Sequence, residues 1–165
     1  MSDVPNGVAD HVVVRMVGFP RPLMRDVIEH LEGLRREFTL LASSEQARGE
    51  VPRRLLEVVR ELSQGTPMPR RTDSGTANED RTFDVRPAAP RGLIRFAHVL
   101  DEADAYCRDG DFLLTLPMSD ELVAFRRWYL GEFVAQVAAM EPLPWADADR
   151  EGLLASPVLR GETRS

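Results

Sequence analysis

The chain has 165 residues, of which 43% are hydrophobic and 29% are charged, and its formal net charge is −6. These values are ordinary for one globular domain with tails, and the chain has no run of ~18 apolar residues that would predict a transmembrane helix. The acidic balance argues against a duplex-binding domain, which normally carries a basic footprint. All 21 basic residues are arginine, so chemistry that needs a lysine amine is excluded, including a P-loop lysine and a Schiff base.

The start of the chain and its cysteine content indicate a cytoplasmic protein. Residues 1–10 have neither the basic nor the apolar region of a signal peptide, and they predict a flexible N-terminus. The single cysteine, Cys107, excludes an internal disulfide and any multi-cysteine metal site. We therefore expect cytoplasmic localisation, no membrane association and a buried, inert thiol at Cys107.

The first half of the chain predicts one strand, two helices and a long loop. The β-branched run HVVVRMV predicts a strand over 11–17. Apolar residues then recur at steps of three and four from Leu23 to about Ala42, which is the stripe of a helix. A second helix is predicted over 51–63. The polar segment 64–80 has almost nothing to bury and predicts a mobile loop.

The second half of the chain alternates strands with long helices. We expect strands over 82–86 and 112–116, and helices over 91–108 and 120–140. The whole order is β-α-α-β-α-β-α, which predicts an α+β fold with about four helices and a small sheet of about three strands. The single domain would span 11–146, and residues 147–165 would form a C-terminal tail.

The stretch VAFRRWYLGEF, residues 123–133, concentrates aromatic side chains on the last long helix. Wound at about 100° per residue, its apolar arc is too wide for a surface helix, so we expect core rather than a base-stacking site. Arg127 falls at the rim of the arc, where it can reach water. Arg126 falls inside the arc and needs a partner, for which Asp104 is the first choice and Asp101 the second. The alternative is that either charge reaches solvent at a helix end.

Catalytic and metal-binding patterns are sparse. His30 and Glu37 lie on one side of the first predicted helix and could form an acid–base pair in a pocket, or a polar pair on the helix flank. The histidines form neither HxH nor HExxH, so no metal site or cofactor is predicted. The letters DEAD at 101–104 fall within a predicted helix of a lysine-free chain and do not indicate a helicase. The sequence gives no positive support for an enzyme.

Two long runs carry a family resemblance. LDEADAYCRDGDFLLTLPMSDELVAFRRWYLGEFVAQ and the opening VVVRMVGFP…LEGLRREFTLLA resemble uncharacterised actinobacterial proteins associated with partner-switching stress signalling. The resemblance implies a protein partner, either an anti-sigma-factor ATPase or a STAS-type antagonist. The chain itself lacks the asparagine box and glycine-rich lid of those ATPases, because its only asparagines are Asn6 and Asn78.

The first hypothesis is therefore a non-enzymatic cytoplasmic regulatory protein that acts by binding another protein, with no nucleic-acid or membrane partner. A small-molecule sensory domain with a ligand pocket is the alternative, followed by an enzyme that uses His30 and Glu37. A polar-lined pocket of ~300 Å³ or more would favour the alternatives. An exposed apolar patch without a pocket would favour the first hypothesis.

Overall fold

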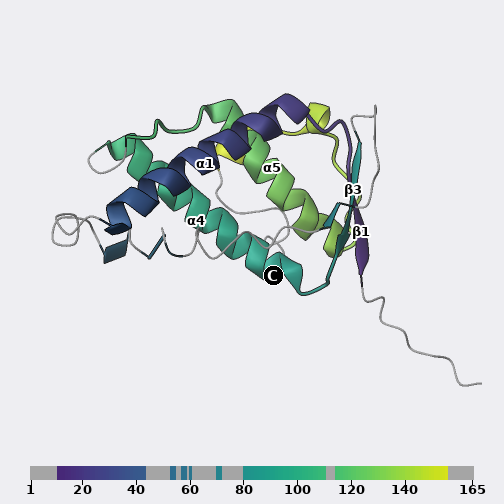
Figure 1. The fold of residues 1–165 in the computed structure, drawn as a ribbon. Coiled ribbons are helices and arrows are strands. Elements are labelled where there is room, and N and C mark those ends of the chain that lie inside the picture. Colours follow the sequence, from purple (N-terminus) through teal and green to yellow (C-terminus); the bar gives the residue numbers. More distant parts are fainter. Residues whose placement is uncertain are drawn as a thin grey trace, which may run out of the picture.

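The computed structural model describes residues 11–43, 53–54, 57–58, 60, 70–71, 80–110 and 114–155. Its elements are, in chain order, β1 (Val12–Met16), α1 (Arg21–Ser43), β2 (Arg70–Arg71), β3 (Arg81–Val85), α4 (Ala89–Asp109), α5 (Asp120–Val137), a 3-10 turn (Trp145–Asp147) and α6 (Arg150–Ala155). Figure 1 shows the long helices α1, α4 and α5 crossing one another, with β1 and β3 at one end of them. This is an α+β fold, rich in helix, as the sequence predicts.

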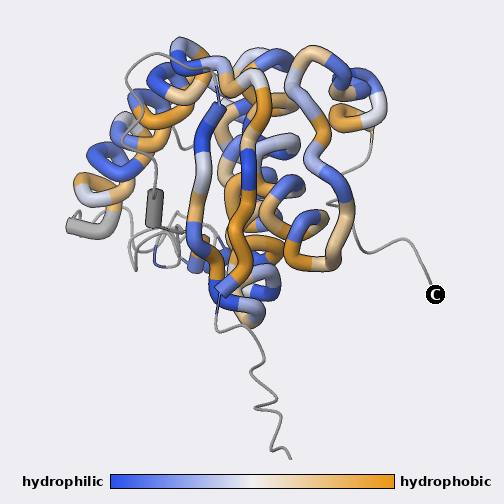
Figure 2. The backbone as a smooth tube through the Cα atoms, turned by 90° about the vertical axis from the view of Figure 1, so that its right-hand side faces the viewer, coloured by the Kyte–Doolittle hydropathy of each residue, from blue (hydrophilic) through white to orange (hydrophobic). Residues whose placement is uncertain are grey.

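The sheet is built around the antiparallel pair of β1 and β3. Val14 lies opposite Phe83 and Met16 lies opposite Arg81, and all four side chains are buried. Val13 and the other alternate positions face outward, which is the period of two expected for a half-covered strand. Figure 2 looks onto the strands, with the helices behind them. The two-residue β2 pairs with β3, so the strand order is β1-β3-β2.

Helix α5 lies at the centre of the fold. Its N-terminus is capped by Ser119, whose Oγ accepts a hydrogen bond from the N–H of Leu122, and Asp120 and Glu121 suit the positive end of the helix dipole. Residues 123–126 and 128–136 are all buried. Helices α1, α4 and α6 and strand β1 pack against α5, which explains why its apolar arc is wide.

The aromatic residues of α5 form the core rather than a surface. The Phe125 ring contacts the rings of Phe19, Trp128, Tyr129 and Trp145, with centroids 5.6–6.1 Å apart. Such edge-on, tilted and stacked arrangements add to the stabilisation from burial. The stretch 123–133 is therefore the inside of the protein, as its periodicity indicates.

Polar side chains on α5 close the edge of the sheet. The Gln136 amide donates to the carbonyl of Arg15 and accepts from its N–H, both at 2.8 Å, so it pairs with β1 as a neighbouring strand would. Gln136 also donates to Glu132, whose carboxylate accepts from the N–H of Leu143 at 2.9 Å. These bonds satisfy the backbone of an edge strand and tie β1 to the segment after α5.

The structure differs from three expectations about the elements. Leu114–Leu116 pairs with no described strand, because the Glu37 carboxylate takes the N–H groups of Leu114 and Thr115 instead. The third strand of the sheet is β2, which lies inside the segment expected to be a mobile loop. Residues 150–155, expected within a C-terminal tail, form α6 and pack against α5.

Other expectations fall partly on residues outside the described part of the chain. Within the second predicted helix, residues 53, 54, 57, 58 and 60 are described, and all are helical. The N-terminus at 1–10, most of the loop at 64–80, residues 112–113 and the tail from 156 onward lie outside it. None of the helices in the described ranges combines the length and apolarity that a membrane span requires.

Candidate functional site

Arg126 is buried in the contact between α4 and α5. Only 4% of its surface is exposed, and its guanidinium donates a hydrogen bond to the Asp101 carboxylate. Its other terminal nitrogen lies 3.5 Å from the carbonyl of Leu100 and from the sulfur of Met118. Burial lowers the pKa of Arg126, and the carboxylates of Asp101 and Asp104 oppose that shift. The pair with Asp101 compensates for burying the charge.

The expected first-choice partner, Asp104, bonds elsewhere. One carboxylate oxygen accepts from the N–H of Met118 at 2.9 Å, and the other lies 3.0 Å from the Arg108 guanidinium. Asp104 is one helical turn beyond Asp101, level with the chain as it enters α5, where a buried N–H needs an acceptor. Asp104 therefore anchors the connection between α4 and α5, and its charge acts on Arg126 from a distance.

Arg127 is more enclosed than its place on the helix rim predicts. Its side chain is 13% exposed, and its guanidinium donates a hydrogen bond to one oxygen of Asp101 at 3.2 Å and lies 3.1 Å from the other as an ion pair. It also donates to the carbonyls of Leu153 and Leu154 in α6, at 2.7 and 3.0 Å. The sequence could not predict these acceptors, because α6 lies in the segment expected to be a tail.

His30 and Glu37 do not form the pair that was considered. The Glu37 carboxylate accepts bonds from the N–H of Leu114 and from the N–H and hydroxyl of Thr115, the latter two at 2.8 and 2.6 Å. Burial raises the pKa of Glu37, but these hydrogen bonds outweigh it and leave the pKa lowered. A carboxylate that is already occupied by three donors is poorly suited to act as a general base.

His30 faces the buried charges between α4 and α5 instead. Burial lowers its pKa, the Asp104 carboxylate raises it, and the Arg126 charge lowers it again. Its Nε2 atom is buried and has no hydrogen-bond partner among the described residues. Burial raises the pKa of the Cys107 thiol on α4 to about 11. His30 and Cys107 thus favour their neutral forms, which fits a structural role.

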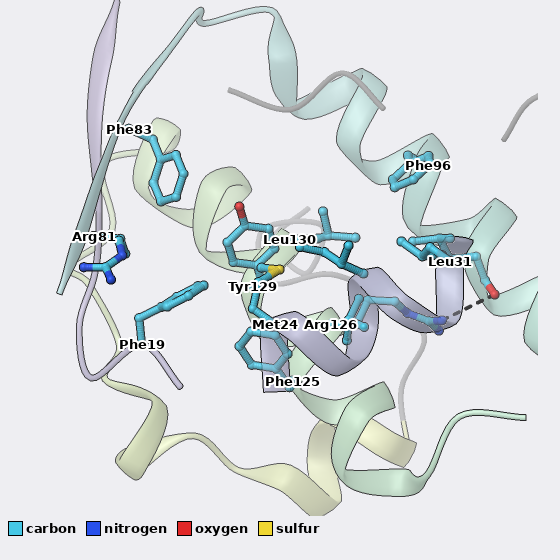
Figure 3. Close-up of a pocket in the computed structure, with 13 residues that line it drawn as sticks. Phe19, Met24, Leu31, Arg81, Phe83, Phe96, Phe125, Arg126, Tyr129 and Leu130 are labelled. Carbon is cyan, nitrogen blue, oxygen red and sulfur yellow. Dashed lines mark hydrogen bonds between the residues drawn. The ribbon is translucent and has the colours of Figure 1, made fainter. Parts of the chain in front are cut away.

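The structure holds a cavity that the sequence does not reveal. Its volume is about 350 Å³, and it lies between α1, β3, α4 and α5. Its walls are mostly large apolar side chains: Phe19, Met24, Val27, Ile28, Leu31, Phe83, Phe96, Leu100, Phe125 and Leu130. Figure 3 shows these side chains converging from separate elements. A volume of this size is within the usual range of small-molecule sites.

Three polar side chains complete the cavity wall. They are Arg81, Arg126 and Tyr129, and Figure 3 shows Arg81 and the guanidinium of Arg126 at opposite ends. Tyr129 is 6% exposed, and its hydroxyl makes no hydrogen bond within the described part of the chain. Burial raises the pKa of Tyr129, so the hydroxyl keeps its proton and can donate it to a bound acceptor.

Neither His30 nor Glu37 lines this cavity. The described residues contain no cluster of three or more histidine, cysteine or carboxylate side chains arranged to hold a metal ion. Comparison of the chain with protein-family models, with curated proteins and with solved structures gives no match.

The cavity escapes sequence reasoning because each wall segment also has the pattern of ordinary core. One signal was available at Arg81. It occupies the same alternating face of β3 as Phe83 and Val85 and is buried to 3% exposure, so an arginine stands where a strand normally places an apolar residue. The predicted strand began at residue 82 and left this position out.

Proposed function

We propose that the chain is a small-molecule sensory domain that binds an apolar ligand in the cavity between α1, β3, α4 and α5. The observation that carries this proposal is a space of about 350 Å³ lined mostly by large apolar side chains. Protein interiors rarely leave voids larger than a water molecule, because every void loses contacts on its walls. A space of this size supports a binding role.

The polar groups of the wall favour binding over catalysis. An arginine guanidinium stays protonated at ordinary pH, and the pKa of Tyr129 is raised by burial. Among the described side chains that line the cavity there is no carboxylate, imidazole or thiol. The wall therefore supplies hydrogen-bond donors and positive charge to orient a ligand, but no group suited to remove a proton.

Binding of a neutral apolar probe tests this proposal. We expect saturable binding of decan-1-ol by titration calorimetry. Ile28 lines the cavity and is 49% exposed, so Ile28→Trp can fill the entrance without forcing a residue into a packed core. This variant should weaken decanol binding about tenfold or more, the equivalent of ~1.4 kcal/mol.

Leu40→Trp is the matched control. Leu40 lies on the same helix, is 70% exposed and does not line the cavity, so decanol should bind this variant as it binds the wild type. Decanol that fails to bind the wild type, or that binds both variants equally well, contradicts the proposal.

The regulatory role remains a prediction alongside this one. A ligand-binding domain fits a signalling module, because a bound ligand changes the relative stability of conformations that a protein partner distinguishes. In this proposal the ligand is the input and contact with another protein is the output. Whether that partner is an anti-sigma-factor ATPase or a STAS-type antagonist stays an expectation from the sequence resemblance.

A further inference from the structure

The wall of the cavity is rich in aromatic rings. Aromatic residues make up 7% of the chain, but they supply five of the 13 side chains that line this space. The five are Phe19, Phe83, Phe96, Phe125 and Tyr129. They come from the turn after β1 and from β3, α4 and α5, so the rings reach the cavity from several directions (Figure 3).

Four of these rings hold one another in place. The centroid of Phe19 lies 5.8 Å from those of Phe125 and Tyr129. The Tyr129 centroid lies 6.1 Å from those of Phe83 and Phe125. These are the separations that paired aromatic rings prefer. The four therefore form a connected cluster whose orientations are fixed before any ligand binds.

Phe96 lines the same cavity but stands apart from this cluster. Figure 3 shows it projecting from α4, away from the other four rings. It is 9% exposed, and none of the ring contacts in the described part of the chain includes it. A ring bound between Phe96 and the cluster would give Phe96 an aromatic partner.

The arginines of the wall already interact with the protein. Arg81 donates a hydrogen bond to the carbonyl of Asp80 at 2.9 Å, and its guanidinium lies 6.0 Å from the centre of the Phe19 ring. Arg126 is paired with Asp101. The chemical class of the ligand therefore follows from the rings of the wall rather than from its charges.

We propose that the ligand is a neutral, planar aromatic molecule held between Phe96 and the four-ring cluster. This inference rests on the proposed function and names the ligand class. An apolar cavity of about 150 Å³ binds benzene, so a volume of about 350 Å³ accepts roughly two or three fused rings. Ring-to-ring contacts add to the free energy of binding beyond the burial of apolar surface. Met24 contributes a sulfur to the wall, which also packs favourably against aromatic rings.

Two probes with the same carbon skeleton test the aromatic preference: 2-naphthol and decahydro-2-naphthol. The saturated probe is the more apolar of the two, so burial of apolar surface alone favours it. Titration calorimetry on the full chain should instead show that 2-naphthol binds about tenfold more tightly. Equal affinities, or tighter binding of the saturated probe, would overturn the aromatic ligand. This comparison uses the wild type and needs no variant.

Removal of the isolated ring locates the contact. Phe96→Leu keeps an apolar side chain at the cavity but takes away its ring. It should weaken 2-naphthol binding about three- to tenfold and change the affinity for decahydro-2-naphthol less than about twofold. Phe38→Leu is the matched control, because Phe38 is a buried phenylalanine, 1% exposed, that does not line the cavity. Both probes should bind this control as they bind the wild type.

The outcomes separate this inference from the proposed function. In one outcome, Ile28→Trp blocks decanol and both naphthol probes, but 2-naphthol is not preferred or Phe96→Leu weakens every probe equally. That result overturns the aromatic ligand and leaves a cavity that binds apolar molecules. If no probe binds, or if Ile28→Trp blocks none of them, both proposals are wrong.

Discussion

Arg126 and Arg127 are adjacent in the chain and share one carboxylate, but they connect different pairs of helices. Arg126 is buried within the packing of α4 on α5, while Arg127 reaches across to α6. Both donate hydrogen bonds to Asp101, whose single negative charge is shared between the two guanidiniums. Loss of the acid therefore leaves the buried Arg126 guanidinium without its carboxylate, whereas loss of Arg126 leaves Asp101 paired with Arg127.

The burial of Arg126 follows from its angular position on the helix, and that much can be predicted from sequence. Which of Asp101 and Asp104 pairs with Arg126 cannot be predicted from sequence. Both residues lie toward one side of α4, and their positions differ mainly by one helical turn along the helix axis. The partner depends on where the chain enters α5, because the N–H of Met118 there donates to Asp104. The partner is thus decided by a loop geometry that periodicity does not encode.

A double-mutant cycle measures the Arg126–Asp101 pair. Asp101→Leu should cost about 3–5 kcal/mol in the free energy of unfolding, because it strands the buried Arg126 charge. Arg126→Met should cost less, about 1–3 kcal/mol, because Asp101 keeps its pair with Arg127. The double variant should recover part of the loss, giving a coupling of roughly 1–3 kcal/mol in urea melts. The matched cycle of Arg126→Met with Asp104→Leu should give a smaller coupling. Strictly additive costs in the first cycle would show that the pair contributes nothing specific.

At the scale of elements, Glu37 holds α1 to the connection between α4 and α5. Its carboxylate supplies the acceptors for Leu114 and Thr115, and that is why residues 114–116 do not form part of the expected strand. Leu114 and Leu116 are 93% and 80% exposed. A segment of β-branched and apolar residues forms a strand only if the edge of another strand is available to pair with it. Here the Glu37 side chain accepts hydrogen bonds from the backbone N–H groups instead.

Glu37→Gln should weaken the protein in a pH-dependent way. The folded pKa of Glu37 is lowered, so its carboxylate stabilises the fold fully above the ordinary pKa of about 4.3, and this contribution is lost as the pH falls through the lowered value. Urea melts should show a cost of about 1–3 kcal/mol at neutral pH. The difference from wild type should shrink below pH 4.

Glu32→Gln, at an exposed position on the same helix, is the control and should change stability by no more than ~0.5 kcal/mol. A Glu37→Gln cost that is the same at acidic and neutral pH would mean that the carboxylate charge is not what holds the connection.

Arg127 is one attachment of helix α6, beside Leu153 and Leu154, which are partly buried against the core. It has six residues and no buried residue of its own, so its propensity alone would not keep it ordered. Arg127→Ala removes the donor to the Leu153 and Leu154 carbonyls and should cost about 1–3 kcal/mol. Hydrogen exchange of the α6 amides should accelerate more than that of α4.

Arg91→Ala is the matched control for this change, because Arg91 is an exposed arginine on α4. It should leave the exchange of the α6 amides unaltered. Equal exchange of α6 in the Arg127→Ala and Arg91→Ala variants would contradict the attachment.

For the whole molecule, the sequence predicts the class of fold and the core helix but misses features made by distant segments. The apolar arc of α5 is visible in its periodicity, because one helix decides it. Strand β2, helix α6 and the cavity each need several segments to meet. A wall assembled from α1, β3, α4 and α5 has no local pattern different from that of a filled core, except at Arg81.

Phe125 joins the core and the cavity, and its removal tests both. It is fully buried, contacts four other aromatic rings and lines the cavity. Phe125→Ala should cost about 3–5 kcal/mol in urea melts, whereas Leu116→Ala, at an 80% exposed position, should cost less than ~0.5 kcal/mol. Because the lost ring enlarges the cavity, saturating decanol should raise the melting temperature of Phe125→Ala, since a ligand that binds only the folded state stabilises it. A small cost at Phe125, close to that at Leu116, would mean that α5 is not the centre of the core.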